Sequence, residues 1–202
     1  MHRPTVFLAA LVLGVGEAIL AAAPSLAIPI TYTEQATASG SLNGVAFINA
    51  TVSLSMNNDT ANVTAPPPVF ENFGTLTLNV NGVAAATFTD ATLAAANQMV
   101  SPVSPNAGFG DDTEGLGILF TKNAAFSTYD LKTSIGPILG APAAFNPGVS
   151  FPTTGGLFIL NSVTGDVTFT ATAATVMPEP ASLTLLGVGL AGFGLIRRRR
   201  KP

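Results

Sequence analysis

The densest group of side chains able to do chemistry is the acidic run Asp111-Asp112-Thr113-Glu114, which lies in a glycine-rich stretch. Hard carboxylate oxygens on a flexible loop can hold Ca²⁺, so Asp111, Asp112 and Glu114 are candidate ligands of a calcium site. Their spacing does not match the EF-hand pattern, which needs alternating ligands and a distant glutamate. A solvated surface turn is the alternative interpretation of these residues, and in that case the protein has no metal or other cofactor.

Residue types for nucleophilic catalysis are missing from the middle of the chain. Between residues 28 and 176 there is no histidine, cysteine or arginine, and the one histidine of the sequence is His2. A Ser–His–Asp or Cys–His arrangement and a histidine-ligated zinc site are therefore excluded from this region. Carboxylate pairs of the kind that glycosidases use remain, but the chain has no tryptophan and two tyrosines to stack on sugar rings. We therefore expect a protein that is not an enzyme.

The same central region is strongly acidic. It carries nine carboxylates against two lysines, a net charge near −7, while the whole chain has a net charge of −3 because its arginines all lie near the termini. Nucleic acid is excluded as a partner, since its phosphates need lysine and arginine. The absence of cysteine excludes thiol chemistry, thiolate metal sites and disulfide bonds.

The C-terminal residues 176–202 form a three-part pattern. Pro178-Glu179-Pro180 is followed by an apolar run at 181–196 and then by the basic run Arg197-Arg198-Arg199-Arg200-Lys201. As a helix, the apolar run spans about 24 Å at ~1.5 Å per residue, somewhat less than the ~30 Å hydrocarbon core of a bilayer. The pattern predicts one short transmembrane helix that anchors the chain transiently, with the arginines on the cytoplasmic side. A permanently anchored protein is the alternative.

This three-part tail resembles the PEP-CTERM sorting signal, found on exported proteins of Gram-negative bacteria that make exopolysaccharide. The resemblance implies that an exosortase, a multi-spanning membrane enzyme, recognises Pro178, Glu179 and Pro180 as its substrate, cuts near them and transfers the exported domain. It also implies an intermediate anchored in the inner membrane and a final location at the cell surface or in the extracellular matrix, with exopolysaccharide or biofilm as a partner. Three further stretches resemble a group of PEP-CTERM proteins with no established activity: Tyr32–Gly40, Ala107–Asp111 and Tyr129–Pro137.

The N-terminal residues 1–27 predict a secretory signal peptide. His2 and Arg3 begin it, an apolar run at 6–15 follows, and Ser25-Leu26-Ala27 supplies small residues for cleavage after Ala27. We expect export through the Sec translocon. The chain then divides into a signal peptide at 1–27, an exported domain at 28–175 and a sorting tail at 176–202.

Strand signals dominate the exported domain. Apolar and polar residues alternate at 48–56 and at 167–173, with a weaker pattern at 30–38. A period of two places the apolar set of each stretch against a core: Ile48, Ala50, Val52, Leu54 and Met56 in the first, Val167, Phe169, Ala171 and Ala173 in the second. Several short strands with glycine and proline turns favour a mainly β fold, an antiparallel β-sandwich.

Other segments are less clearly patterned. Asn81-Gly82 predicts a hairpin within 75–90. A two-residue turn would put Leu76 and Phe88 on opposite faces, so either both faces are partly covered or the turn is longer. Short strands are expected at 116–122 and 157–160, a strand or short helix at 126–131, and a helical turn at 90–99. The stretches 101–115 and 136–156 are expected to be loops.

Overall fold

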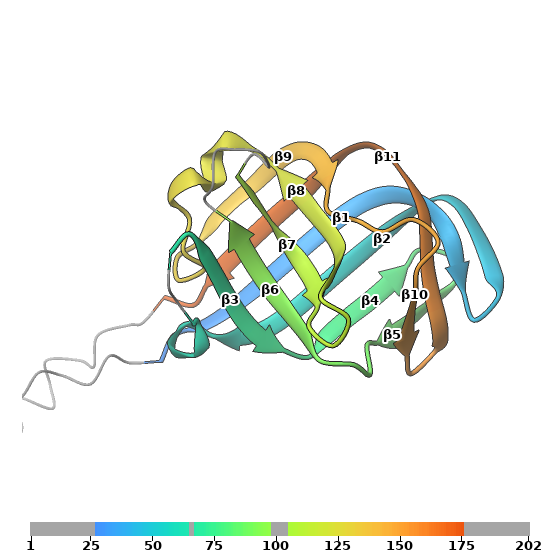
Figure 1. Ribbon diagram of the computed structural model, residues 1–202, viewed down its shortest axis with the longest axis horizontal. Helices are drawn as coiled ribbons and strands as arrows, with labels where there is room; N and C mark the ends of the chain where they lie inside the picture. The colour runs from blue at the N-terminus through green and yellow to red at the C-terminus, as the bar shows by residue number, and fades with distance from the viewer. Residues whose placement is uncertain (1–26, 65–66, 98–104, 176–202) are drawn as a thin grey trace, which may run out of the picture.

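The computed structural model describes residues 27–64, 67–97 and 105–175, which form a mainly β domain (Figure 1). Its strands are β1 Pro29–Leu42, β2 Val45–Asp59, β3 Val69–Gly74, β4 Leu76–Val80, β5 Ala84–Thr87, β6 Thr92–Asn97, β7 Asn106–Asp111, β8 Leu116–Lys122, β9 Ile135–Ala143, β10 Ser150–Thr153 and β11 Gly156–Ala173. Two short 3-10 helices join them, η1 Thr60–Asn62 and η2 Ala124–Thr128.

The strands pair in one antiparallel sheet, in the order β3-β6-β7-β8-β9-β11-β1-β2-β4-β5, with β10 added against β11. The sheet curls into a half-barrel, so that β7 and β8 lie over β1 and β11 across a shared apolar core (Figure 1). The prediction of a mainly β antiparallel domain is confirmed. The predicted sandwich is corrected, because its two layers are the two halves of one continuous sheet.

Strand β9 forms the corner between these halves. Its residues 135–140 pair with β11, and its residues 141–143 pair with β8. A side chain on Gly140 would collide with the carbonyl oxygen of Lys122, so glycine lets the two backbones approach closely there. Each part of β9 is hydrogen-bonded on one side, which leaves room for Pro137 and Pro142. Proline-rich sequence therefore forms a strand where a loop was predicted.

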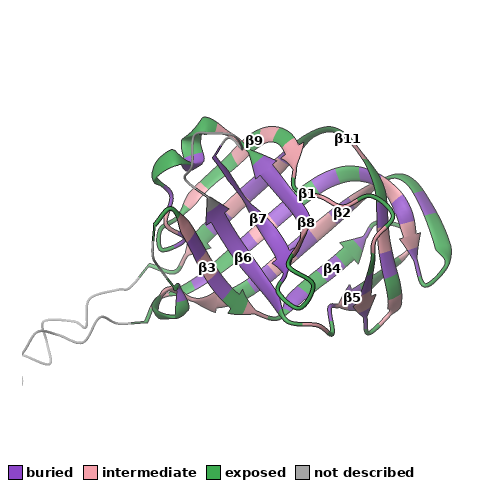
Figure 2. Cartoon of the chain, in the orientation of Figure 1, coloured by how far each residue is buried: buried purple, intermediate pink, exposed green. Residues whose placement is uncertain are grey.

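The two longest pairings, β1 with β11 and β1 with β2, show the predicted alternation of buried and exposed residues (Figure 2). Val52, Leu54 and Met56 are buried as predicted, but Ile48 is 79% exposed. A bulge explains this difference, because three steps along β2 oppose two along β1 and Asn49 has a φ of 50°. The extra residue turns Phe47 inward in place of Ile48.

The predicted hairpin is present, and its turn is longer than two residues. Val80 pairs with Ala84, so Asn81, Gly82 and Val83 make the turn. This register puts Phe88 on the buried face with Leu76, and the two are joined by a backbone hydrogen bond of 3.0 Å. The longer turn therefore resolves the choice that the sequence left open.

The end of β5 meets β10, which is itself paired with β11. Strands β11, β1, β2, β4, β5 and β10 therefore follow one another around this end of the domain. Phe88 forms an isolated bridge with Thr153, and the Thr154 amide donates to the Thr87 carbonyl oxygen over 2.8 Å. Stacked and edge-on rings fill this end of the core: Phe47, Phe88, Phe151 and Phe158. These aromatic contacts stabilise the packing of β2, β10 and β11 at this end of the core.

Three further segments differ from prediction. The alanine-rich stretch proposed as a helical turn is strand β6, whose Ala94 and Ala96 are fully buried. The stretch 101–115 holds strand β7, and the stretch 136–156 holds most of β9 and all of β10. Residues 124–128 form η2, the short helical alternative for that region. Tertiary burial outweighs local propensity in β6, since small side chains fit between packed strands.

The two ends of the described domain lie side by side. Ile30 in β1 pairs with Ala173 in β11, and the Ala174 amide donates to the Pro29 carbonyl oxygen over 2.8 Å. Both ends lie at the left of Figure 1, opposite the turn that joins β1 to β2.

Candidate functional site

The acidic run at 111–114 forms the turn from β7 to β8. Asp111 is 2% exposed, and its Oδ1 accepts the backbone amides of Thr113 and Glu114 over 2.8 and 3.1 Å. Asp112 and Glu114 are exposed. Among residues 27–64, 67–97 and 105–175, no three carboxylates gather in a way that could hold a metal ion. The geometry therefore supports the surface-turn interpretation, in which Asp111 stabilises the turn.

The residues predicted to direct sorting lie outside the described part of the chain. This holds for Pro178, Glu179 and Pro180, for the apolar run 181–196, and for Arg197 to Arg200. The predicted signal peptide also lies outside it, except for Ala27, which is exposed just before β1. In the described residues no helix has the length and apolar character to cross a bilayer.

A carboxyl group that the sequence analysis did not single out lies in the core. Glu34 on β1 is fully buried, and its Oε1 accepts a 2.8 Å hydrogen bond from the Thr121 hydroxyl on β8. Its Oε2 has no hydrogen-bond partner among the described residues. Burial raises the pKa of Glu34 well above its ordinary value, and the Thr121 hydrogen bond opposes this only in part. The alternation at 30–38 could have predicted the burial of Glu34, because this residue lies on the same face of the strand as Ile30 and Tyr32.

A second polar group lies beside it in the core. The Tyr32 hydroxyl donates to the Leu131 carbonyl oxygen over 2.6 Å and accepts from Asn72 Nδ2 over 2.9 Å. Burial raises the pKa of Tyr32 to about 12, and it also raises the pKa of Tyr129. These bonds tie β1, β3 and the segment after η2 together. Since the groups are closed off from solvent, they act in stability rather than in binding.

The outward face of the sheet carries rows of hydroxyl and amide groups. Register places one row across five neighbouring strands, and a second row runs beside it. The first row is Thr170, Thr33, Ser55, Thr77 and Thr87. The second is Thr168, Gln35, Ser53 and Asn79, and it ends on β5 at Ala85, which has no polar side chain. Neighbouring strands lie ~4.8 Å apart, so the polar groups of a row follow one another at about that spacing.

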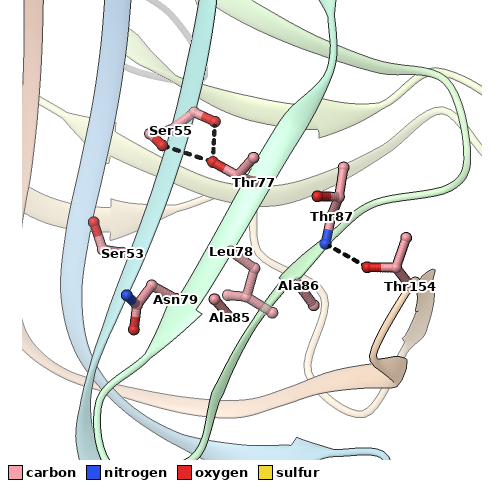
Figure 3. A pocket seen from close by; sticks show the side chains of 9 residues that line it. All are labelled: Ser53, Ser55, Thr77, Leu78, Asn79, Ala85, Ala86, Thr87 and Thr154. Carbon is pink, nitrogen blue, oxygen red and sulfur yellow. Dashed lines mark hydrogen bonds between the residues drawn. The ribbon is translucent and has the colours of Figure 1, made fainter.

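A hollow of about 460 Å³ lies where these rows cross β2, β4 and β5 (Figure 3). Ser53, Ser55, Thr77 and Asn79 line it from β2 and β4, and Thr154 closes it from the turn before β11. The hydroxyls of Ser55 and Thr77 are 2.7 Å apart, and the Thr77 hydroxyl lies 3.0 Å from the Ser55 carbonyl oxygen. The Thr87 amide donates to the Thr154 hydroxyl over 3.0 Å. The sequence indicates a polar strand face at Ser53 and Ser55 but no site, since the hollow depends on pairing between separate strands.

Another hollow, of about 380 Å³, lies on the outward face of β6, β7 and β8. Leu93, Ala95 and Phe120 form a small apolar cluster under it. The carboxylates that line it, from Glu71, Asp111 and Asp112, come from β3 and the β7–β8 turn. Asp111 stabilises the turn through its Oδ1 atom, and its Oδ2 atom is buried without a hydrogen-bond partner among the described residues.

Comparison with known proteins identifies the C-terminal end of the chain. The family model of the PEP-CTERM protein-sorting motif matches residues 178–200, which contain Pro178-Glu179-Pro180, the apolar run and the arginines. No curated protein and no solved structure matches the chain significantly. The motif implies export and processing by an exosortase-type membrane enzyme. The chain is therefore a PEP-CTERM domain-containing protein, whose described part is a curled antiparallel β domain.

Proposed function

We propose that this chain is a non-enzymatic surface protein of a Gram-negative bacterium, sorted by an exosortase at Pro178-Glu179-Pro180 and retained in the exopolysaccharide or biofilm matrix. The observation that carries the proposal is the sorting motif at residues 178–200. The motif occupies the C-terminus, where an apolar run and a basic stop can hold the chain in the inner membrane until it is cut. The signal peptide at 1–27 brings the chain to the Sec translocon.

The composition of the domain supports a role without catalysis. Its central region lacks histidine, cysteine and arginine, and the fully buried carboxyl group of Glu34 faces the core rather than a hollow. A catalytic carboxylate must reach substrate, because proton transfer needs hydrogen-bond contact. The outward face instead offers hydroxyl groups, which suit a matrix of sugars.

The processing step is tested on protein isolated from its native cells, by intact mass and C-terminal sequencing. We expect a mature chain that ends near residue 178 and lacks Arg197 to Lys201. Glu179→Ala should leave the tail in place and the protein in the inner-membrane fraction, while Ser182→Ala, just after the motif, should be processed normally. A mature protein that keeps its full arginine tail would contradict the proposal.

Matrix retention is tested separately. Cells that make no exopolysaccharide should release the processed protein into the medium, and cells that make it should hold the protein in the polysaccharide fraction. Equal release from both kinds of cell would contradict retention in the matrix, while leaving the sorting step intact.

A calcium-binding surface module is the alternative. The structure gives it little support, because the Oδ1 atom of Asp111 already accepts two backbone amides and no three carboxylates of the described residues gather at one point. A carbohydrate-binding module is supported by the hollow between β2, β4 and β5, because hydroxyl and amide side chains line it.

A further inference from the structure

The hollow between β2, β4 and β5 differs in charge from the rest of the domain. The central region carries nine carboxylates and two lysines, yet no residue that lines this hollow is charged. The two rows of polar residues that cross it contain no charged side chain either. A hydroxyl-rich hollow without charge gives a cation no carboxylate ligand and an anion no positive partner, and the strongly negative net charge of the central region repels anions further.

Part of the hydrogen-bonding capacity of the hollow is unused. A hydroxyl offers one donor and two acceptor positions, and an amide side chain offers two donors and an acceptor. Ser55 and Thr77 bond to each other and keep acceptor positions for a ligand. Within the described part of the chain, the Ser53 hydroxyl and the Asn79 amide make no hydrogen bond to another protein group. These two side chains are therefore ready to donate to a ligand and to accept from it.

We infer that this hollow binds an uncharged polysaccharide, which deepens the proposed function by assigning the matrix contact to a site. Sugar hydroxyls match these groups in kind, since Ser53 and Asn79 can both donate and accept, while Ser55 and Thr77 can accept. The volume of about 460 Å³ falls within the ~300–1,000 Å³ of small-molecule sites. The hollow lies on rows that continue over β1 and β11, so an extended polymer can follow the face beyond it.

The affinity for one short segment should be low. No aromatic ring lines the hollow, so stacking does not contribute and hydrogen bonds exchange with those of water at a small net gain. We expect a Kd of about 1 mM for an oligosaccharide. A long chain that contacts several copies of the protein binds far more tightly, because its later contacts form at high effective concentration.

The test uses the processed protein purified from its native cells. Binding is measured by NMR titration and by affinity electrophoresis against a panel of uncharged α- and β-linked oligosaccharides, with oligoalginate as the charged comparison. The variant Thr77→Val with Asn79→Leu removes the polar groups and keeps the side-chain size. The matched control is Thr172→Val, an exposed threonine of β11 on the same outward face but outside the hollow.

We expect saturable binding of an uncharged oligosaccharide, at least tenfold weaker binding by the double variant, and no change with Thr172→Val. A thermal unfolding curve confirms that the double variant is folded. Failure of every uncharged oligosaccharide to bind would overturn the inference, and so would equal binding of oligoalginate or unchanged binding by a folded double variant. C-terminal processing is measured on the same samples. If the tail is removed normally but no uncharged oligosaccharide binds, the sorting proposal stands and the binding inference is wrong. If the tail is retained, the sorting proposal is wrong, whatever the binding result.

Discussion

Thr121 on β8 donates a 2.8 Å hydrogen bond to the carboxyl group of Glu34 on β1, across the core between the two halves of the curled sheet. The two residues are 87 positions apart in the chain, and both are fully buried. This contact places an ionisable group at the centre of the domain and makes its protonation state part of the folding equilibrium.

Glu34→Gln should remove a pH dependence of stability. Because burial raises the pKa of Glu34 in the folded state, the unfolded chain ionises first as the pH rises above the ordinary glutamate pKa. The wild type should therefore lose stability from about pH 4.5 upward relative to the variant, by up to ~1.4 kcal/mol per pH unit. Urea unfolding between pH 4 and pH 8 measures the difference. Asp166→Asn, at an exposed carboxylate, is the control, and parallel curves for Glu34→Gln and the wild type would contradict the assignment.

Asp111→Ala should destabilise the domain whether calcium is present or not. The change removes two hydrogen bonds to the turn amides, a loss of about 1–3 kcal/mol. Asp111→Asn keeps an acceptor oxygen and should retain much of the stability, and Asp112→Ala, at an exposed neighbour, should have little effect. The measurement is chemical unfolding with calcium and with a chelator. A rise in the unfolding midpoint on adding calcium to the wild type would show that the loop does hold the metal.

Gly108→Ala should strongly destabilise the core. A Cβ atom there would collide with the Leu119 carbonyl oxygen and would lie 2.7 Å from Glu34 Oε2. Overpacking of this kind costs about 1–3 kcal/mol or more. Gly110→Ala on the same strand is the matched control, since its nearest neighbour would be the Leu116 carbonyl oxygen at 3.3 Å. Thermal unfolding of the pair checks the prediction, which is wrong if the two variants behave alike.

Asn49→Val should destabilise the β2 bulge, and Asn49→Gly should not. Asn49 has a φ of 50°, where a β-branched side chain is strained by about 1–2 kcal/mol and glycine is not. The comparison is made by urea unfolding. Thr51→Val, on the same strand beyond the bulge, controls for the gain of an apolar side chain. Equal stability of the valine and glycine variants at position 49 would mean that the bulge does not need this backbone conformation.

The sequence predicted those parts of the fold in which burial follows a regular period. Val52 to Met56 and Val167 to Ala171 lie as alternation predicts, because the alternate apolar side chains of each stretch face one core. Alternation failed at Ile48, where an inserted residue changes the phase of the strand. No local pattern predicts such an insertion, which depends on the partner strand.

The glycines and prolines of 101–115 and 136–156 led to a wrong prediction of loops, where the structure has strands β7, β9 and β10. In β7 and β9 they were read as breakers, but Gly108 and Gly140 are required by close backbone contacts, and Pro142 lies in a part of β9 that is paired on one side. The hydroxyl-lined hollow was missed for a related reason. Ser53 and Thr77 look like ordinary outward-facing strand residues until register brings their strands together.

The pairing of Ile30 with Ala173 has a geometric consequence for attachment. The chain leaves β11 beside the point at which it enters β1, so an attachment made through the proposed sorting step would hold the domain at one end. β1 has 14 residues and extends about 45 Å from that end at ~3.3 Å per residue. The turn at Asn43 and Gly44, at the far end of β1, would then be the part of the domain most distant from the point of attachment.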